Sequence, residues 1–175
     1  AYFSERIIGD PKRVYFPHIE GDPAFWKPEP DDIIKVQQCN PLFLNGASYE
    51  RWRKAVTLPE RRIIDTSSAF QAQRIEIPNT ITHQHGPKGD HSHSGTAFTV
   101  WLDFDLATKQ VLTIENSLAE HMSMPPAELK KNRDSLINEL HLMQDQLKLL
   151  ASNKSNPKLV ASHPIYQYFA RAYYL

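Results

Sequence analysis

Short apolar runs alternate with helical patterns over the first hundred residues. Leu42–Leu44 stops at an Asn-Gly pair, which is typical of a buried strand that ends in a turn, and Arg62–Asp65 has the same strand-like character. Between them, Tyr49–Val56 places Trp52 and Val56 at helical spacing. Further strands are expected at Arg13–Phe16, Arg74–Ile77, Ala97–Leu102 and Lys158–Ala161. Strands that alternate with helices predict βαβ units, and therefore an α/β fold with a mostly parallel sheet flanked by helices.

Two long amphipathic helices follow. Asp103 is a good N-cap for the first, whose apolar stripe consists of Ala107, Val111, Ile114, Leu118 and Met122. A Pro-Pro pair opens the second, which runs to about Ser152 and has one apolar side formed by Leu129, Leu136, Leu140, Met143, Leu147 and Leu150. At 1.5 Å per residue this helix would be about 40 Å long. That length suits a connection between two lobes, and we interpret the leucine stripe as core packing rather than as a coiled coil.

The segment Thr82–Gly95 holds half of the chain's eight histidines. They form two His-x-His pairs, His83 with His85 and His91 with His93, and in extended backbone residues i and i+2 point to the same side. Glycines and a proline between the pairs let the segment bend back, so the two pairs could converge on one ion. Neutral imidazole suits zinc, and also copper, nickel and iron. The alternative is a polar loop whose histidines have no essential role; a purification tag is disfavoured because the segment is internal.

Two further histidines are candidate ligands. His163 follows a predicted strand and precedes a proline, which keeps it extended, and ligands of open α/β sheets bind just outside the carboxyl ends of strands. A structural capping role for His163 is the alternative. His18 lies in a proline-rich loop and is a weaker candidate, because a lone loop histidine is usually solvated.

The amino-acid composition limits which binding partners and which kinds of metal site are expected. Twenty basic residues balance twenty acidic ones in 175 residues, which removes any general electrostatic reason to bind nucleic acid or an anionic membrane. The single Cys39 excludes a disulfide framework and a cysteine-rich zinc ribbon, so a metal would be held by histidine and carboxylate. No run approaches the eighteen or so apolar residues of a membrane span, and no signal peptide is recognised. The chain opens inside a helical pattern at Tyr2–Ile8 and closes on an aromatic-rich one at Leu175, so both ends are expected to be incomplete.

The order and spacing of several short motifs resemble the cluster A-I substrate-binding proteins of bacterial zinc and manganese ABC importers, the ZnuA/TroA-like family. Besides the His-rich segment, the matching residues are Gly21-Asp22-Pro23, Pro28, Pro30, Asp32-Ile33, Asn45-Gly46, Trp101-Leu102-Asp103, Asn132, Ser162-His163-Pro164 and Tyr168-Phe169-Ala170. The resemblance implies two α/β lobes joined by one long rigid helix, with the metal held between the lobes. It also implies that a His-rich loop beside the cleft helps to collect zinc.

The chain departs from the family pattern at two ligand positions. The family usually has a histidine after Gly-x-Asp-Pro and another two residues before Trp-Leu-Asp, where this chain has Ala24 and Thr99. The third usual histidine matches His163, and the fourth ligand, a carboxylate, would lie beyond Leu175. We expect loop histidines to substitute as ligands, with His93 and His91 nearest the vacated position, His85 and His83 as an accessory pair, and His18 as an outside candidate.

With this resemblance, the chain divides into three segments. Residues 1–124 are expected to form an N-terminal α/β metal-binding lobe with the His-rich loop at 82–95. Residues 125–153 form the long inter-lobe helix, and residues 154–175 the first strand and helix of a truncated C-terminal lobe. Self-association of an incomplete chain is an alternative left open.

The resulting functional hypothesis is a periplasmic, or extracellular and membrane-associated, protein that captures Zn²⁺ and delivers it to an ABC permease, and that is not an enzyme. Zinc is favoured over Mn²⁺ because the candidate ligands are rich in nitrogen. One alternative is a zinc-dependent hydrolase with a loop-held metal, although the chain has no His-Glu-x-x-His helix and no Gly-x-Ser-x-Gly elbow. Another is a structural α/β lobe whose His-rich loop is incidental.

Overall fold

The computed structural model describes residues 1–21, 23–84, 90–122, 124–152, 160–161 and 163–175, and for residues 78–84 and 90–94 it describes the backbone alone. The α-helices are α1 (Tyr2–Ile8), α2 (Pro30–Gln38), α3 (Phe104–His121), α4 (Pro126–Ser152) and α5 (Gln167–Tyr173). The strands are β1 (Leu42–Leu44), β2 (Ile63–Asp65), β3 (Glu76–Gln84) and β4 (Asp90–Thr96). Short 3-10 turns join them at Pro11–Arg13 (η1), Pro23–Phe25 (η2), Arg51–Ala55 (η3), Glu60–Arg62 (η4), Ser68–Gln73 (η5) and Val100–Leu102 (η7).

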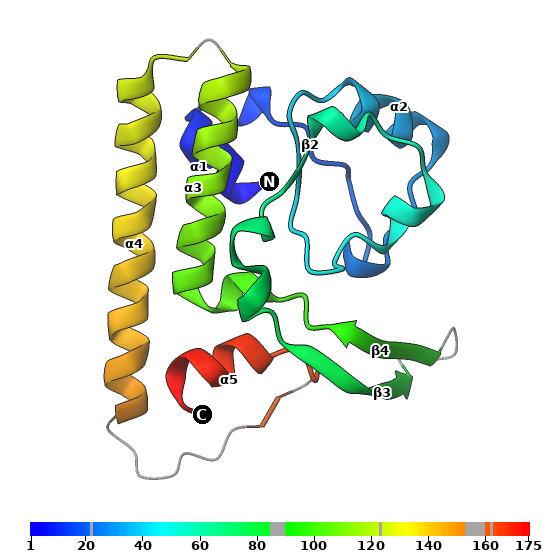
Figure 1. Cartoon of the computed structure of the whole chain (residues 1–175), viewed down its shortest axis with the longest axis vertical. Helices are drawn as coiled ribbons and strands as arrows, with labels where there is room; N and C mark the ends of the chain where they lie inside the picture. Colours follow the sequence, from blue (N-terminus) through cyan, green and yellow to red (C-terminus); the bar gives the residue numbers. More distant parts are fainter. Residues whose placement is uncertain (22, 85–89, 123, 153–159, 162) are drawn as a thin grey trace.

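The α/β class expected from the sequence is confirmed, with the described strands arranged as two small sheets. β1 and β2 pair in parallel, with Leu42 opposite Ile63 and Leu44 opposite Asp65. β3 and β4 form an antiparallel hairpin that extends away from the helices (Figure 1). In its described parts the predicted His-rich loop is therefore strand, because residues 82–84 belong to β3 and residues 90–95 to β4.

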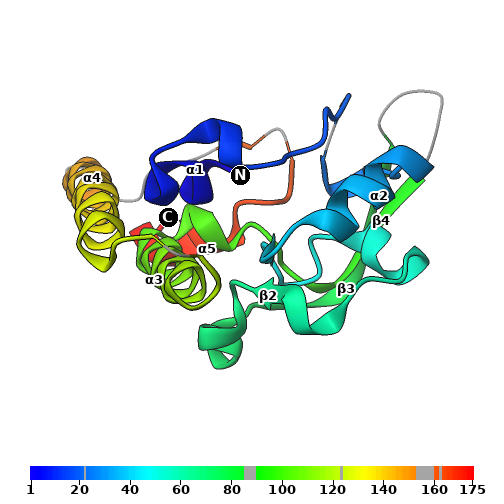
Figure 2. The ribbon, with the colours of Figure 1, turned by 90° about the horizontal axis from the view of Figure 1, so that it is seen from above.

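The helical half of the molecule is organised around α3. Figure 2 shows α4 at one end of the molecule, α1 and α3 next to it, and α2 with the hairpin at the opposite end. The predicted stripe of α3 is buried from Ala107 to Leu118, where it packs in one core with α1 and with Leu129, Leu136 and Leu140 of α4. Polar contacts hold the same helices together: Arg6 of α1 pairs with Glu139 of α4 at 2.5 Å, and Arg133 of α4 pairs with Glu115 of α3 at 2.7 Å.

The apolar stripe predicted for α4 is buried only in its first part. Met143 and Leu150 are 43% and 65% exposed, and Leu142 and Leu149 beside them are exposed too. The reason is length: α4 has 27 residues and α3 has 18. α3 ends and α4 begins at the connection between them, so the last turns of α4 run past the first turn of α3, towards the side where α5 lies (Figure 1).

The segment around α5 returns to the core formed by the first half of the chain. Tyr168 and Tyr173 are at most 1% exposed, and Tyr168 belongs to a cluster with Phe70, Val100 and Leu106. The backbone N–H of Ile75 donates to the Tyr168 hydroxyl at 3.1 Å. α5 is therefore fixed against η5, η7 and the start of β3.

Three short segments differ from the prediction. Arg13–Phe16 contains the end of η1 and no described strand, Tyr49–Val56 forms the 3-10 turn η3 rather than an α-helix, and Ala97–Leu102 ends in the 3-10 turn η7. Apolar residues in these segments make individual contacts rather than forming a periodic apolar face. Trp52, for example, lies edge-on against Trp26 with ring centroids 5.4 Å apart. The predicted strand Lys158–Ala161 lies largely outside the described residues, and its described end, Val160 and Ala161, is not in a strand. None of the helices in the described ranges combines the length and apolar character needed to cross a bilayer.

Candidate functional site

A cavity of about 480 Å³ lies where three distant segments of the chain meet. One wall consists of the turn after β1 and of η3, through Ser48, Glu50, Arg51 and Lys54. A second wall is the base of the β3–β4 hairpin with residues 97–99, and a third is the stretch from Pro164 to Gln167 at the start of α5. We call this space the hairpin cavity. It lies where the strands that carry the predicted His-rich segment meet the residues that follow His163.

The turn that forms the first wall has a left-handed backbone. Gly46, Ala47 and Ser48 have φ values of 78°, 49° and 64°, a region that costs side-chain-bearing residues energy. Glycine is required at the first position, because a Cβ on Gly46 would lie 1.8 Å from the Asp65 carboxylate and 2.3 Å from the Ser67 hydroxyl. This close approach lets the turn sit directly on the end of β2.

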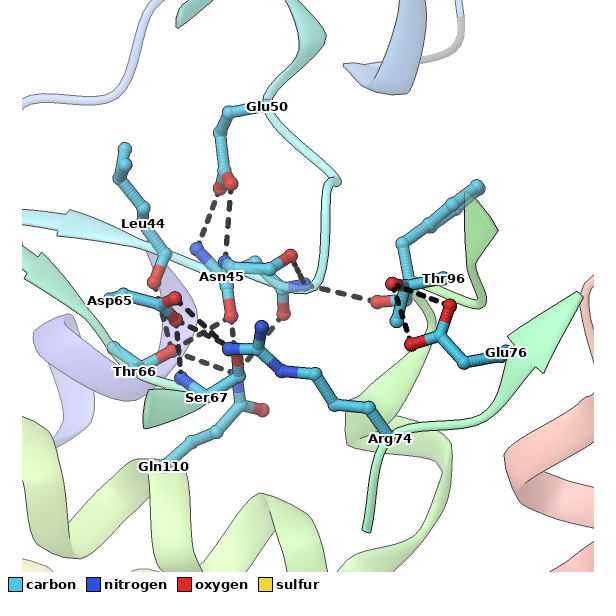
Figure 3. Close-up of polar contacts among 12 residues, drawn as sticks. Leu44, Asn45, Glu50, Asp65, Thr66, Ser67, Arg74, Glu76, Thr96 and Gln110 are labelled. Atoms are coloured by element: carbon cyan, nitrogen blue, oxygen red, sulfur yellow. Dashed lines mark hydrogen bonds and ion pairs between the residues drawn. The ribbon is translucent and has the colours of Figure 1, made fainter. Parts of the chain in front are cut away.

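Hydrogen bonds to two side chains hold this turn in place (Figure 3). The Glu50 carboxylate accepts the backbone N–H of Asn45 at 2.6 Å and that of Gly46 at 3.2 Å. The Asn45 side-chain amide donates to the Phe98 carbonyl at 3.0 Å, and Gln110 of α3 donates to the Asn45 side-chain oxygen at 3.1 Å. The turn is therefore tied to α3 below it and to the second wall of the cavity.

The electrostatics of the cavity centre on Glu50. Burial raises the pKa of its carboxyl from 4.5 to about 7, the negative charge of Asp65 adds to this rise, and the hydrogen bonds from Asn45 and Gly46 oppose it. Two exposed cations, Arg51 and Lys54, line the same cavity. The site thus combines basic side chains with a carboxyl group that changes charge near neutral pH.

Of the three positions at which the resemblance implies histidine ligands, one lines the hairpin cavity, and the other two are next in sequence to residues that line the cavity or contact its lining. Thr99 is 3% exposed and lines it, and its hydroxyl donates to the Ile165 carbonyl. His163 directly precedes Pro164, which also lines the cavity. Ala24 is buried in η2, which packs against η3; the Arg51 guanidinium lies 4.8 Å from the ring centre of Phe25. The structure therefore brings to the hairpin cavity segments that are up to 139 residues apart in the sequence, from 24 to 163.

The structure describes some candidate ligands completely, some by their backbone alone, and one not at all. In the hairpin, His83 is the register partner of His91, and His93 is the partner of Ile81, so His83 and the pair of His91 with His93 lie on adjacent strands. His85 lies outside the described residues, as do the side chains of the other three. His163 is partly buried, and its carbonyl accepts the N–H of Ile165 at 2.9 Å. His18 is exposed in the segment between η1 and η2 and does not line the described part of the cavity.

No set of three or more histidine, cysteine or carboxylate side chains in the described ranges is arranged to hold a metal ion. The described walls instead offer Glu50, Arg51 and Lys54, which sequence reasoning missed. One signal could have drawn attention to Glu50: a carboxylate four residues after a strand-ending Asn-Gly pair can reach back to the free N–H groups of that turn. Its burial, however, depends on contacts with distant segments.

Comparisons with known proteins agree on one family. A family model described as "Zinc-uptake complex component A periplasmic" (ZnuA) matches residues 1–175, whereas no curated protein matches the chain. Among solved structures, a zinc-bound deletion mutant of ZnuA is similar with a TM-score of 0.77, 23% identity, and coverage of 99% of this chain and 63% of that chain. A second ZnuA structure gives a TM-score of 0.74 at 21% identity, covering 99% and 64%. The metal-dependent lipoprotein YcdH from Bacillus subtilis gives 0.76 at 19% identity, covering 99% and 60%. The chain thus spans less than two thirds of the length of these structures.

Proposed function

The chain belongs to the family of periplasmic zinc-uptake complex component A proteins, which are solute-binding proteins rather than enzymes, and from this premise we propose that it captures Zn²⁺ and delivers it to the permease of an ABC importer. Its place of action in this proposal is the periplasm or the outer face of a membrane. The zinc-hydrolase alternative has no support in a family of binding proteins. The proposed division remains an N-terminal lobe at 1–124, a linking helix at 125–153 and the start of a second lobe at 154–175.

The observation that carries the proposal is that Thr99 lines the hairpin cavity, that Pro164, directly after His163, lines it too, and that Phe25, directly after Ala24, contacts the cavity residue Arg51. These segments are η2, the stretch before η7 and the stretch before α5, and they approach the cavity only through the tertiary fold. A metal carrier needs convergent donors beside an opening, because the ion must enter and leave without chemical change. A site at the junction of several segments meets this need.

Two of these positions offer no strong ligand, so the imidazoles must come from elsewhere. Ala24 has no donor atom, and the Thr99 hydroxyl is engaged with Ile165. We assign His163, His93 and His91 as ligands, with His85 and His83 as an accessory pair and His18 as an outside candidate. The backbone register supports this assignment, since paired positions such as His83 and His91 lie on one face of an antiparallel ladder.

Zinc is the preferred ion in this proposal because the proposed ligands are mainly imidazole nitrogens, whereas Mn²⁺ favours oxygen donors. The zinc-bound ZnuA structure among the similar proteins points the same way.

Isothermal titration with Zn²⁺ tests the proposal. His163→Ala, and a fourfold variant with alanine at His83, His85, His91 and His93, should each weaken binding by more than the roughly 10–100-fold that losing an outer-sphere partner costs. His141→Ala removes an exposed histidine from α4 and serves as the matched control, with unchanged affinity expected. Titration of the unmodified protein with Mn²⁺ should give weaker binding. Wild-type affinity in both histidine variants would contradict the assigned ligands, and no binding by the unmodified protein would remove the carrier function.

A further inference from the structure

Glu50 stands at the boundary between two hollow regions of the protein. It lines the hairpin cavity, and it also lines a second cavity of about 470 Å³ between α1, β1 and α3. The Glu50 side chain is partly buried, and part of its surroundings is hollow rather than packed hydrophobic core. Its carboxyl group takes its polar partners from the adjacent turn.

Two requirements on this carboxyl group conflict. The Asn45 N–H points to one carboxylate oxygen and the Gly46 N–H to the other, an arrangement that fits an ionised carboxylate, because that form only accepts hydrogen bonds. Burial favours the neutral form, in which one oxygen carries a proton and must itself donate. A neutral Glu50 would place this hydroxyl opposite a backbone donor, so one of the two bonds to the turn must weaken.

The turn held by Glu50 connects to the segment of His163 through hydrogen bonds. The Asn45 side chain donates to the Phe98 carbonyl at 3.0 Å, and the next residue, Thr99, donates to the Ile165 carbonyl. The Ile165 N–H in turn donates to the His163 carbonyl at 2.9 Å. A displacement of the turn would therefore act on the wall at residues 97–99 and on the wall that begins at Pro164.

Several other charged groups surround Glu50. Asp65 lies beneath the turn and repels a negative charge on Glu50, although its own carboxylate is paired with Arg74 at 3.1 Å. The amino group of Ala1 interacts with Glu50 from the side of the second cavity. Arg51 and Lys54 line the hairpin cavity but are exposed, so water screens them. Among the residues that the structure describes, Glu50 forms no ion pair with these cations, and its carboxylate accepts hydrogen bonds from the backbone N–H groups of Asn45 and Gly46.

We propose that Glu50 positions the wall of the hairpin cavity, and that proton uptake by its carboxylate loosens the turn at 46–48 and, through Asn45 and Thr99, the segment that carries His163. The ionised form holds the wall in the described arrangement, and the neutral form releases it. The consequence for metal affinity rests on the proposed function, whereas the effect on the turn does not. Below neutral pH the cavity would therefore hold Zn²⁺ less tightly than proton competition at the histidines alone requires.

The test uses the metal-free protein first. Backbone amide NMR of the wild type between pH 5 and 8.5 should show Asn45, Gly46 and Thr99 changing together with a midpoint near 7. Glu50→Gln should abolish this shared transition, and Glu50→Asp, which keeps a carboxylate, should retain a transition with a displaced midpoint. Glu128→Gln, which neutralises an exposed carboxylate in the first turn of α4, is the matched control and should behave as the wild type.

Zn²⁺ titration at pH 6 and pH 8 then adds the functional readout. In Glu50→Gln the affinity should fall several-fold at pH 8 and change less between the two pH values than in the wild type. Persistence of the amide transition in Glu50→Gln, or its absence from the wild type, would overturn the proposal. If Glu50→Gln does not fold, the carboxyl carbon of Glu50 in the wild type decides: a midpoint near 7 shared with the amides supports the proposal, and one near 4.5 overturns it. A wild type that shows the transition but binds no Zn²⁺ would refute the carrier function and support the role of Glu50 in the turn.

Discussion

Replacement of Gly46 by alanine should destabilise the protein more than replacement of any exposed glycine. The new Cβ would lie 1.8 Å from the Asp65 carboxylate oxygen and 2.3 Å from the Ser67 hydroxyl, distances at which atoms must move. The left-handed φ of 78° adds about 1–2 kcal/mol for a residue with a Cβ.

The displaced carboxylate accounts for the rest of the cost. Asp65 accepts hydrogen bonds from the Ser67 N–H at 2.8 Å and the Ser67 hydroxyl at 2.7 Å, and it pairs with Arg74 at 3.1 Å. It cannot move away from the new methyl group and keep all three. Since a hydrogen bond to a charged group contributes about 1.5–3 kcal/mol, the loss of one brings the total to about 4 kcal/mol. This is a large part of the stability of an ordinary domain.

Urea denaturation followed by tryptophan fluorescence measures this loss, and the midpoint should fall by about 2 M if the slope is typical for a small protein. Gly21→Ala is the matched control: Gly21 has a φ of 83° but no atom within 4 Å of its Cβ position, so only the backbone term of about 1–2 kcal/mol applies. In an Asp65→Ser background, Gly46→Ala should cost less, because the hydrogen bonds it breaks are already absent. Equal effects of Gly46→Ala and Gly21→Ala would refute the assignment of a steric conflict at the end of β2.

Three further predictions concern the core, a helix cap and pH. Leu136→Ala should lower the free energy of unfolding by about 2–5 kcal/mol because the side chain is 1% exposed, whereas Leu142→Ala, at 63% exposed, should change it by at most about 0.5 kcal/mol in the same urea titration. Asp103→Ala removes the acceptor for two backbone N–H groups at the start of α3 and the partner of Arg171, so thermal unfolding followed by circular dichroism should show a loss of about 1–3 kcal/mol, with a smaller loss in Asp103→Asn. Because the pKa of Glu50 is raised from 4.5 to about 7 in the folded state, its contribution to stability is fully present below pH 4.5 and is lost as pH rises through 7. This contribution is at most about 3 kcal/mol, and the decline in unfolding free energy between pH 5 and pH 8 should be smaller in Glu50→Gln; an equal decline would contradict it.

The sequence predicted the long helices best. α3 and α4 were expected from stripes such as Val111 and Leu118 or Leu129 and Leu136, because many periodic positions reinforce one another over several turns. The strands β1 and β2 were also predicted. Each is a short apolar run, followed by the Asn-Gly turn in β1 and flanked by charged residues in β2. The exposure of Met143 was not predictable, because periodicity gives the apolar side of a helix but not the length of its partner.

The candidate site was less accessible to sequence reasoning. The family resemblance indicated positions 24, 99 and 163; the structure places Thr99 in the wall of the hairpin cavity and the other two next to residues that line the cavity or contact its lining. The roles of the individual histidines stay predictions. The raised pKa of Glu50 depends on its partial burial by distant segments and on the charge of Asp65 in β2, neither of which follows from its neighbours in the sequence. The helix expected at Tyr49–Val56 was wrong: this segment forms the 3-10 turn η3, in which Trp52 packs edge-on against Trp26, a residue distant in the sequence.

The placement of α5 has a consequence for synthesis on the ribosome. The N–H of Ile75, at the start of the hairpin, is satisfied by a hydroxyl 93 residues later in the chain, and the carbonyl of Gln73 by Arg171, 98 residues later. During translation the hairpin base would thus remain without these partners for several seconds, at typical elongation rates of about 5–20 residues per second. Closure over so long a stretch of chain is entropically slow, so the helical half should become ordered first and the hairpin should dock last.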